Sequence, residues 1–254
     1  MDDDNTKVFF SALLLAGVAY GGWWAYRKVS APVPAPAVSS PAPAPEAPAR
    51  PDLPKLEESD NHVRLALSRL STDPRLAEWL KQEDLLPRLV SAASQLGRGL
   101  VPRDGLQAFA PKGKFPVLKK DGKIYADPKG WARYDAAAKA VGSIDAAGAA
   151  SFYANFEPLI DQAYKSLGEG PSARDAVASA AAELCSADAN DAAKPLKEGK
   201  KGIVYAYEDE RLESLSLARK QLLRMGPRNA ATVQAKARAF ALALGIPEAR
   251  LKKP

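Results

Sequence analysis

Apolar residues recur at intervals of three and four over most of the chain after residue 54. The segments "NHVRLALSRL", "EDLLPRLVSAASQLGRG" and "AAGAASFYANFEPLIDQAYKSLG" show this spacing clearly. Because an α-helix has ~3.6 residues per turn, this spacing places the apolar side chains on one face of each helix. We therefore expect a mainly helical globular domain over residues 55–254.

Polar residues and prolines indicate where these helices begin and where they are interrupted. Three aspartates are expected to cap helix N-termini, namely Asp60, Asp73 and Asp145. Pro158 lies inside a long apolar-periodic segment. Because proline lacks an amide hydrogen and clashes with the preceding turn, we expect it to kink or break that helix.

Two stretches depart from the helical period. In "FPVLKKDGKIYAD", apolar residues flank Asp121-Gly122, a dipeptide typical of the tight turn of a β-hairpin. "GIVYAYED" is a candidate for a further short strand. The predicted fold class is therefore mainly α, a multi-helix globular domain with one or two small β-hairpins.

The N-terminal region predicts a single transmembrane helix. Residues 1–7 are a short polar tail, and Val8 to Tyr26 form a run of 19 residues without charge. At ~1.5 Å per residue, a helix of this length spans the ~30 Å hydrocarbon core of a bilayer. Arg27 and Lys28 complete the expected anchor, residues 8–28, at the headgroup level. A cleaved signal peptide is the competing interpretation, but no clear cleavage motif follows the apolar run directly.

Residues 29–54 are expected to be a linker. Nine of the 24 residues from Ala31 to Pro54 are proline, and seven of the other fifteen are alanine. Proline fixes φ and donates no hydrogen bond, so this composition favours an extended polyproline II chain reaching roughly 75 Å. The sequence thus predicts a domain held away from a membrane by a semi-rigid arm.

The orientation of the expected anchor depends on which signal dominates. Arg27 and Lys28 outnumber Lys7, which counted strictly favours a cytoplasmic domain. A short N-terminal tail, one anchor and a spacer are instead the usual layout of inner-membrane proteins that project outward. These signals leave the orientation ambiguous, and the lipid bilayer is the expected partner through Val8 to Tyr26.

Charge is distributed unevenly along the chain. The formal net charge is +6, but residues 211–254 alone carry ten Lys+Arg and two Asp+Glu, a balance of +8. The two preceding regions, residues 1–54 and 55–210, each balance to −1. A basic C-terminal segment indicates either a local anionic partner or a solvated helix pair.

The sequence offers few groups for catalysis. His62 and Cys185 are the only residues of their types, so an ordinary zinc site is not expected, and no phosphate-binding glycine motif is present. Glu157 and Asp161 share a helix face, but this spacing is common in helices. We therefore expect no metal and no cofactor, we assign no catalytic residue, and we favour a protein that is not an enzyme.

The stretch "QLLRMGPRN" is the best candidate for a binding site. Gly226 and Pro227 are expected to form a hinge that ends one helix and begins the next. A helix N-terminus attracts anions through its free amides. The residues predicted to bind an anion there are Arg219, Lys220, Arg224, Arg228 and Asn229. The alternative is that Arg224 pairs with an acid elsewhere in the domain and stabilises the joint.

Four further stretches form a recognisable set: "LPKLEESDNHVRLALSRLSTDPRLAEWL", "DGKIYADPKGWARYDA", "EPLIDQAYKSLG" and "KQLLRMGPRNAATVQAKAR". These stretches resemble an uncharacterised bacterial family, domain of unknown function 3014. The resemblance covers roughly residues 53–244. It implies an inner-membrane anchor followed by a Pro/Ala-rich linker and a periplasmic domain, and it supplies no catalytic residues.

Three functions are compatible with these observations. The first is a non-enzymatic, membrane-anchored binding or scaffolding module in the cell envelope, whose partner is an anionic envelope component or a protein. The second is an envelope hydrolase with unidentified carboxylates. The third, least favoured, is a cytoplasm-facing nucleic-acid binder that uses the basic C-terminal helix pair.

Overall fold

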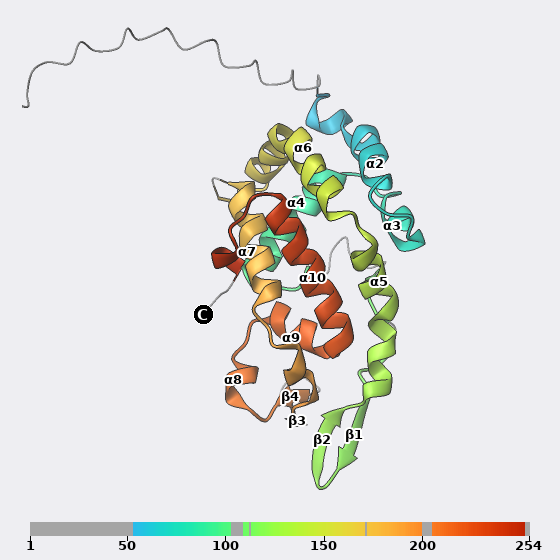
Figure 1. Ribbon diagram of the computed structural model, residues 1–254, viewed down its shortest axis with the longest axis vertical. Helices are drawn as coiled ribbons and strands as arrows, with labels where there is room; N and C mark the ends of the chain where they lie inside the picture. Colours follow the sequence, from blue (N-terminus) through green and yellow to red (C-terminus); the bar gives the residue numbers. More distant parts are fainter. Residues whose placement is uncertain (1–52, 103–108, 112, 171, 200–204, 252–254) are drawn as a thin grey trace, which may run out of the picture. The chain divides into compact units, whose positions relative to one another are not determined.

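The helices and strands of the chain follow the predicted mixture of long helices and short strands (Figure 1). The computed structural model describes residues 53–102, 109–111, 113–170, 172–199 and 205–251. Its helices are η1 (Leu56–Glu58), α2 (Asp60–Ser68), α3 (Pro74–Trp79), α4 (Leu85–Gly97), η3 (Pro128–Tyr134), α5 (Asp135–Ser143), α6 (Ala146–Ser166), α7 (Ala173–Cys185), η4 (Ala189–Ala193), α8 (Glu210–Glu213), α9 (Leu217–Arg224), α10 (Pro227–Ala243) and α11 (Glu248–Leu251). The strands are β1 (Val117–Lys120), β2 (Lys123–Ala126), β3 (Leu196–Glu198) and β4 (Tyr205–Tyr207). The mainly α prediction is confirmed.

Two of the three predicted caps are confirmed and one is wrong. The Asp73 carboxylate accepts a hydrogen bond from the Arg75 amide at 2.9 Å and caps α3, and Asp145 likewise caps α6. Asp60 lies inside α2, whose N-cap residue is Ser59. The Asp60 carboxylate instead accepts from the amides of Asp84 and Leu85, at 2.8 and 2.9 Å. It thus satisfies amides at the start of a different helix, α4.

Pro158 does not break its helix. The helix α6 runs from Ala146 to Ser166 with Pro158 inside it. On either side of the proline, Phe156 and Leu159 are buried in the core. Each fully buried side chain of this size contributes roughly 1.5–3 kcal/mol, so the two together outweigh the ~3 kcal/mol that a proline costs a helix interior. Packing therefore holds the helix together across the proline.

The strands form one antiparallel sheet in the order β1-β2-β3-β4. Asp121 and Gly122 both have positive φ, 52° and 73°, as the predicted tight turn between β1 and β2 requires. The segment "GIVYAYED" supplies β4. It pairs with β3, which the alternation of apolar residues did not reveal, and Ile124 on β2 pairs with Leu196 on β3. The expected hairpins are therefore joined into a single sheet.

Two hydrophobic clusters form the core. The first lies among α2, α3, α4, α6 and α7 and includes Val63, Trp79 and Leu86. The second lies under the sheet and includes Leu196, Tyr207, Leu212, Leu222 and Leu223. The helix α10 contributes to both clusters, with Ala230 and Val233 in the second and Ala241 in the first. In Figure 1, α10 runs between the α2 end of the domain and the sheet end.

The expected anchor, residues 8–28, lies outside the described residues, as does most of the expected linker. The structure describes no helix that is both long and apolar enough to cross a membrane. Leu53, assigned to the linker from sequence, packs against the first hydrophobic cluster. The ordered contacts of the domain therefore begin slightly earlier than residue 55.

Candidate functional site

The structure places a helix joint at the position that the sequence predicted. The helix α9 ends at Arg224 and α10 begins at Pro227. Gly226 lies between them with φ 81° and ψ 163°, a combination that is essentially restricted to glycine. The Trp131 side chain packs directly on this glycine, because an added Cβ would lie 2.4 Å from Trp131 Cγ. Gly226 therefore provides both the turn and the space for the indole.

Asn229 connects the joint to the segment that carries Trp131. It is 4% exposed and lies in the first turn of α10. Its side-chain amide donates to the carbonyls of Trp131 and Met225, at 3.0 and 3.1 Å, and to the Asp135 carboxylate at 2.9 Å. One buried side chain thus joins α9, α10 and the start of α5.

Arg228 lies at the surface beside the same carboxylate. Its guanidinium pairs with Asp135 at 2.7 Å, although the Arg228 side chain is 79% exposed. The hydrogen bond from Asn229 and then the hydrogen bond from Arg228 lower the pKa of Asp135 below its ordinary value. Asp135 is therefore ionised at neutral pH and is bound on two sides.

The other three candidate residues also have partners inside the domain. Lys220 pairs with Glu213 at 2.7 Å. Partial burial would raise the pKa of Glu213, but the hydrogen bonds from Lys220 and from the Tyr207 amide outweigh it and lower that pKa. Arg224 donates to the Tyr205 carbonyl at 3.4 Å, and its guanidinium lies 5.9 Å from the centroid of the Phe115 ring. The alternative interpretation gave Arg224 an acid as its partner. The partners in the structure are a carbonyl and an aromatic face.

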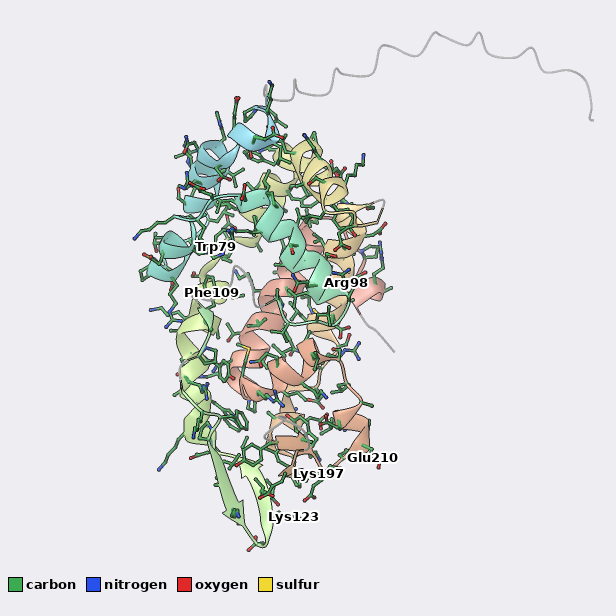
Figure 2. The ribbon with its side chains drawn as sticks, turned by 180° about the vertical axis from the view of Figure 1, so that it is seen from behind. Trp79, Arg98, Phe109, Lys123, Lys197 and Glu210 are labelled. Carbon is green, nitrogen blue, oxygen red and sulfur yellow. The ribbon has the colours of Figure 1, made fainter. Side chains whose placement is uncertain are left out.

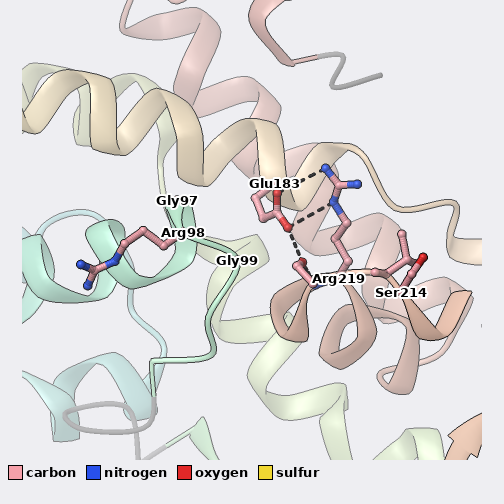
Figure 3. A pocket seen from close by; sticks show the side chains of 8 residues that line it. Gly97, Arg98, Gly99, Glu183, Ser214 and Arg219 are labelled. Atoms are coloured by element: carbon pink, nitrogen blue, oxygen red, sulfur yellow. Dashed lines mark hydrogen bonds and ion pairs between the residues drawn. The ribbon is translucent and has the colours of Figure 1, made fainter. Parts of the chain in front are cut away.

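Arg219 lies in a recess of about 420 Å³ between α4, α7 and the start of α9 (Figure 3). The lining residues include Gly97, Arg98, Gly99, Glu183, Ser214, Ser216 and Arg219. The Glu183 carboxylate, 3% exposed, lies 3.2 Å from Arg219 Nε, and it also accepts from the Ser216 hydroxyl. Arg98 points away from this pair and binds Glu169 at the surface. The opposite charges in the recess therefore neutralise one another.

The Ser216 hydroxyl is fully used by the fold. It donates to Glu183 and accepts from the Arg219 amide at 3.1 Å, which makes it the N-cap of α9. Gly99 closes the arrangement, since its carbonyl accepts from the Ala218 amide at 2.9 Å and an added Cβ would lie 2.7 Å from Ser216 Cβ. The recess is thus a tightly built junction between helices.

Taken together, the five predicted anion-binding residues surround the joint, but each of them is directed to its own intramolecular partner. The same holds for the basic C-terminal segment as a whole. Of its ten basic residues, Lys252 and Lys253 lie outside the described part, and the remaining eight all contact another group of the domain: Arg211, Arg219, Lys220, Arg224, Arg228, Lys236, Arg238 and Arg250. Anion binding at the joint stays a prediction.

The remaining candidates for chemistry are dispersed. His62 is exposed in the first turn of α2, and Glu157 pairs with Arg174 at 3.7 Å. Burial raises the pKa of the Cys185 thiol, which lies near the Gln234 carbonyl. In the part of the chain that the structure describes, no three His, Cys, Asp or Glu residues are grouped so that they could hold a metal ion.

A second charged feature lies on the sheet. Because side chains alternate between the two faces of a strand, the register separates the residues into two sets. One set packs on the second hydrophobic cluster through Val117, Ile124, Ala126, Leu196, Tyr205 and Tyr207, and the exposed Lys119 and Glu198 share this face by register. The other set faces outward and consists of Leu118, Lys120, Lys123, Tyr125, Lys197 and Ala206. Within the four strands, the outward face therefore carries three lysines and no acidic residue, and Glu208, just after β4, pairs with Lys123.

These three lysines form a row across the sheet. Lys120 on β1 pairs directly with Lys123 on β2. Since Ile124 pairs with Leu196, the adjacent positions Lys123 and Lys197 also lie side by side. Figure 2 labels Lys123 and Lys197 at the same end of the domain. We call Lys120, Lys123 and Lys197 the lysine row.

The lysine row is electrostatically unfavourable for the isolated domain. Like charges directly opposite each other on neighbouring strands destabilise a sheet by about 0.2–1 kcal/mol per pair. Within the described residues, Lys123 has one acidic neighbour, Glu208 at 3.7 Å, and Lys120 and Lys197 have no ion pair. These residues do not stand out in the sequence. The alternation in "VLKK" and "KIYA" was visible, but the position of β3 was not.

These features define a mainly α domain. It has a glycine-containing joint between α9 and α10 and a small antiparallel sheet with a basic outer face. A family model described as "Protein of unknown function (DUF3014)" matches residues 85–241, from the start of α4 to near the end of α10. The chain belongs to this family. No curated protein and no solved structure matched the chain.

Proposed function

We propose that the protein is a membrane-anchored, non-enzymatic binding or scaffolding module that contacts a negatively charged partner through the lysine row. The observation that carries this proposal is the cross-strand set Lys120, Lys123 and Lys197, in which Lys123–Glu208 is the one ion pair within the described residues. An anionic partner would relieve the repulsion between these lysines. The unfavourable free energy of this repulsion in the unbound domain would then be recovered on binding and would strengthen it.

The predicted anchor and linker support the same function. Residues 8–28 would hold the chain in a bacterial inner membrane, and residues 29–54 would project the domain into the periplasm. In the domain, Leu53 packs on the first hydrophobic cluster, whereas the lysine row belongs to the sheet over the second. The binding face would then lie at the end of the domain away from Leu53.

The two alternative functions have less support. The nucleic-acid alternative rested on the basic helix pair, and the basic side chains that the structure describes there are all engaged with other groups of the domain. The hydrolase alternative rested on carboxylates that the sequence does not identify, and Glu157, one of the two acids that share a helix face, has Arg174 as its partner. Neither alternative is favoured by a specific observation on the described residues.

Binding of poly-L-glutamate to the full chain in detergent micelles tests the role of the lysine row. In a fluorescence anisotropy titration, replacing Lys120, Lys123 and Lys197 by Gln should weaken the apparent affinity roughly tenfold or more, and added salt should weaken the wild type. The matched control replaces three exposed cationic residues elsewhere, Arg69→Gln, Lys139→Gln and Lys165→Gln, with the same change in net charge.

The outcomes of that titration separate a binding face from general attraction. Retained affinity in the control and lost affinity in the lysine-row variant would support the proposal. Equal loss in both would mean that net charge alone attracts the polymer. A single-stranded oligonucleotide of matched charge, run in parallel, shows whether phosphate is preferred over carboxylate, as the nucleic-acid alternative requires.

The predicted location is tested separately by a reporter fused after Pro254 that is active only outside the cytoplasm. The proposal expects activity that depends on residues 8–28. An inactive periplasmic reporter together with an active cytoplasmic one would reverse the predicted orientation.

A further inference from the structure

An acidic recess lies at the other end of the domain from the lysine row. It has a volume of about 390 Å³ and is formed by η1, the start of α2 and the connection from α3 to α4. The lining residues are Glu57, Glu58, Asp60, Asn61, Arg64, Glu83 and Asp84. In Figure 1, α2 and the β1–β2 hairpin lie at opposite ends of the helical part.

Most of the negative charge of this recess is unpaired. Arg64 is the only basic residue in its lining, and it donates to the backbone carbonyls of Leu80 and Gln82 and to the Asn61 side chain. The Asp60 carboxylate is bound by two backbone amides. The four other acids, Glu57, Glu58, Glu83 and Asp84, are exposed and form no ion pair within the described ranges.

The two charged surfaces complement each other but cannot meet within one molecule. The lysine row crosses β1, β2 and β3 at the sheet end of the domain, where the β1–β2 hairpin projects with Asp121 and Gly122 at its tip (Figure 1), whereas the acids surround an open depression. A positive projection at one end and a negative depression at the other end match in charge and form. Only a second molecule can bring one against the other.

We infer that the negatively charged partner of the lysine row is the acidic recess of a second copy of this chain. This inference rests on the proposed function, because both use the same face of the sheet. The contact joins two different surfaces, so it repeats from molecule to molecule and builds chains or closed rings. Anchoring of all copies in one membrane raises their local concentration, which allows individually weak contacts to act together.

A charge-swap experiment on the full chain in detergent micelles tests the inference. One variant reverses the sheet, with Lys120→Glu, Lys123→Glu and Lys197→Glu. The other reverses the recess, with Glu57→Lys, Glu58→Lys and Glu83→Lys. Asp60 and Asp84 are left unchanged, because the first binds backbone amides and the second has φ 57°. Association is followed by sedimentation velocity at low ionic strength, where exposed charges are least screened.

The inference predicts that the wild type associates as its concentration rises and that salt reverses this. Each swapped variant alone should remain at the size of one chain, because both of its charged surfaces then have the same sign. An equimolar mixture of the two variants should associate again. The glutamates of the sheet variant can then contact the lysines in the recess of the other variant, and the lysine row of the recess variant can contact the unchanged acidic recess. No association of the mixture, or unchanged association of either variant alone, would overturn the inference.

Binding of poly-L-glutamate distinguishes failure of this inference from failure of the proposed function. A neutral recess variant (Glu57→Gln, Glu58→Gln and Glu83→Gln) keeps its lysine row and gains no cationic side chain, so it should bind the polymer at least as well as the wild type does. If it binds the polymer while neither wild type nor mixture associates, the lysine row serves another anionic partner and self-association is wrong. If the wild type does not bind the polymer either, the proposed function is also wrong.

Discussion

Gly226 determines how the joint between α9 and α10 packs against the segment that carries Trp131. Its backbone conformation excludes other residues, and the Trp131 side chain occupies the space that a Cβ would need. Asn229 then binds the carbonyl of the same tryptophan and the Asp135 carboxylate. A few side chains around one glycine thus fix the joint between α9 and α10 against the start of α5.

Replacing Gly226 by Ala should lower the free energy of unfolding by about 3 kcal/mol or more, because backbone strain and the overlap with Trp131 add together. Chemical denaturation of the full chain measures this loss. Gly168→Ala is the matched control, since Gly168 also has a positive φ, 69°, but an added Cβ would meet nothing within 4 Å. Its loss should be only about 1–2 kcal/mol. Equal losses would show that the contact with Trp131 does not matter.

Asn229→Ala should destabilise the domain by about 1–3 kcal/mol, because it leaves buried carbonyls and a carboxylate without their donor. Asn190→Ala provides the comparison, since Asn190 is exposed and its amide donates only to Asp188. The account expects little change there. Thermal or chemical unfolding of the two variants gives both values. A comparable small effect at both positions would remove Asn229 from the set that holds the joint.

The contribution of Asp135 should depend on pH in a defined direction. Its pKa is lowered in the folded protein, so its bonds to Asn229 and Arg228 stabilise the fold above about pH 4 and are lost as pH falls through the folded value. The difference in unfolding free energy between wild type and Asp135→Asn should therefore be largest near neutral pH and shrink below pH 4. A difference that grows on acidification would contradict the assigned contacts.

At the scale of elements, the sheet differs from the helices because the lysines on its outer face destabilise it. The inner face of β1 and β2 packs on the second hydrophobic cluster, whereas the outer face places Lys120 opposite Lys123. The C-terminal helices show the reverse situation, because the basic residues described there contact other parts of the fold. Charge on the sheet is therefore the better guide to a partner.

A single neutral substitution in the hairpin should separate stability from binding. Lys120→Gln removes the repulsion with Lys123, so it should raise the free energy of unfolding by about 0.2–1 kcal/mol while weakening binding of poly-L-glutamate. Lys119→Gln is the control, because Lys119 lies on the other face and pairs with Ile124. It should change neither quantity appreciably. Reduced stability of Lys120→Gln would mean that the lysine has a structural role.

Local signals in the sequence predicted local structure well. The caps at Asp73 and Asp145, the turn at Asp121-Gly122 and the joint at Gly226 all depend on neighbouring residues. What the sequence did not reveal depends on distant partners. Asp60 binds amides 24 and 25 positions away, and Asn229 binds Asp135 across 94 positions. The lysine row likewise requires the pairing of β2 with β3, which no local pattern specifies.

At the scale of the whole molecule, the uneven distribution of charge along the sequence leads to ion pairs between the C-terminal segment and the middle of the chain. Basic residues of the C-terminal segment pair with acids from the middle of the chain, as in Arg228–Asp135, Arg219–Glu183, Arg211–Asp191 and Arg250–Asp175. Exposed pairs of this kind contribute little individually, and the buried Arg219–Glu183 pair mainly makes loss of either partner costly. The lysine row and the acidic recess are two groups of like charge with few ion pairs within the described residues.

The central claim is that the lysine row contacts a negatively charged partner. The most direct test is the rate of lysine acylation, measured at each position by mass spectrometry on the wild-type full chain with and without poly-L-glutamate. The account predicts that Lys120, Lys123 and Lys197 become several-fold less reactive with the polymer, while Lys139 and Lys165 are unchanged. Unchanged rates along the lysine row, with protection at Lys220 or Lys236 instead, would contradict it and return the binding site to the C-terminal helices.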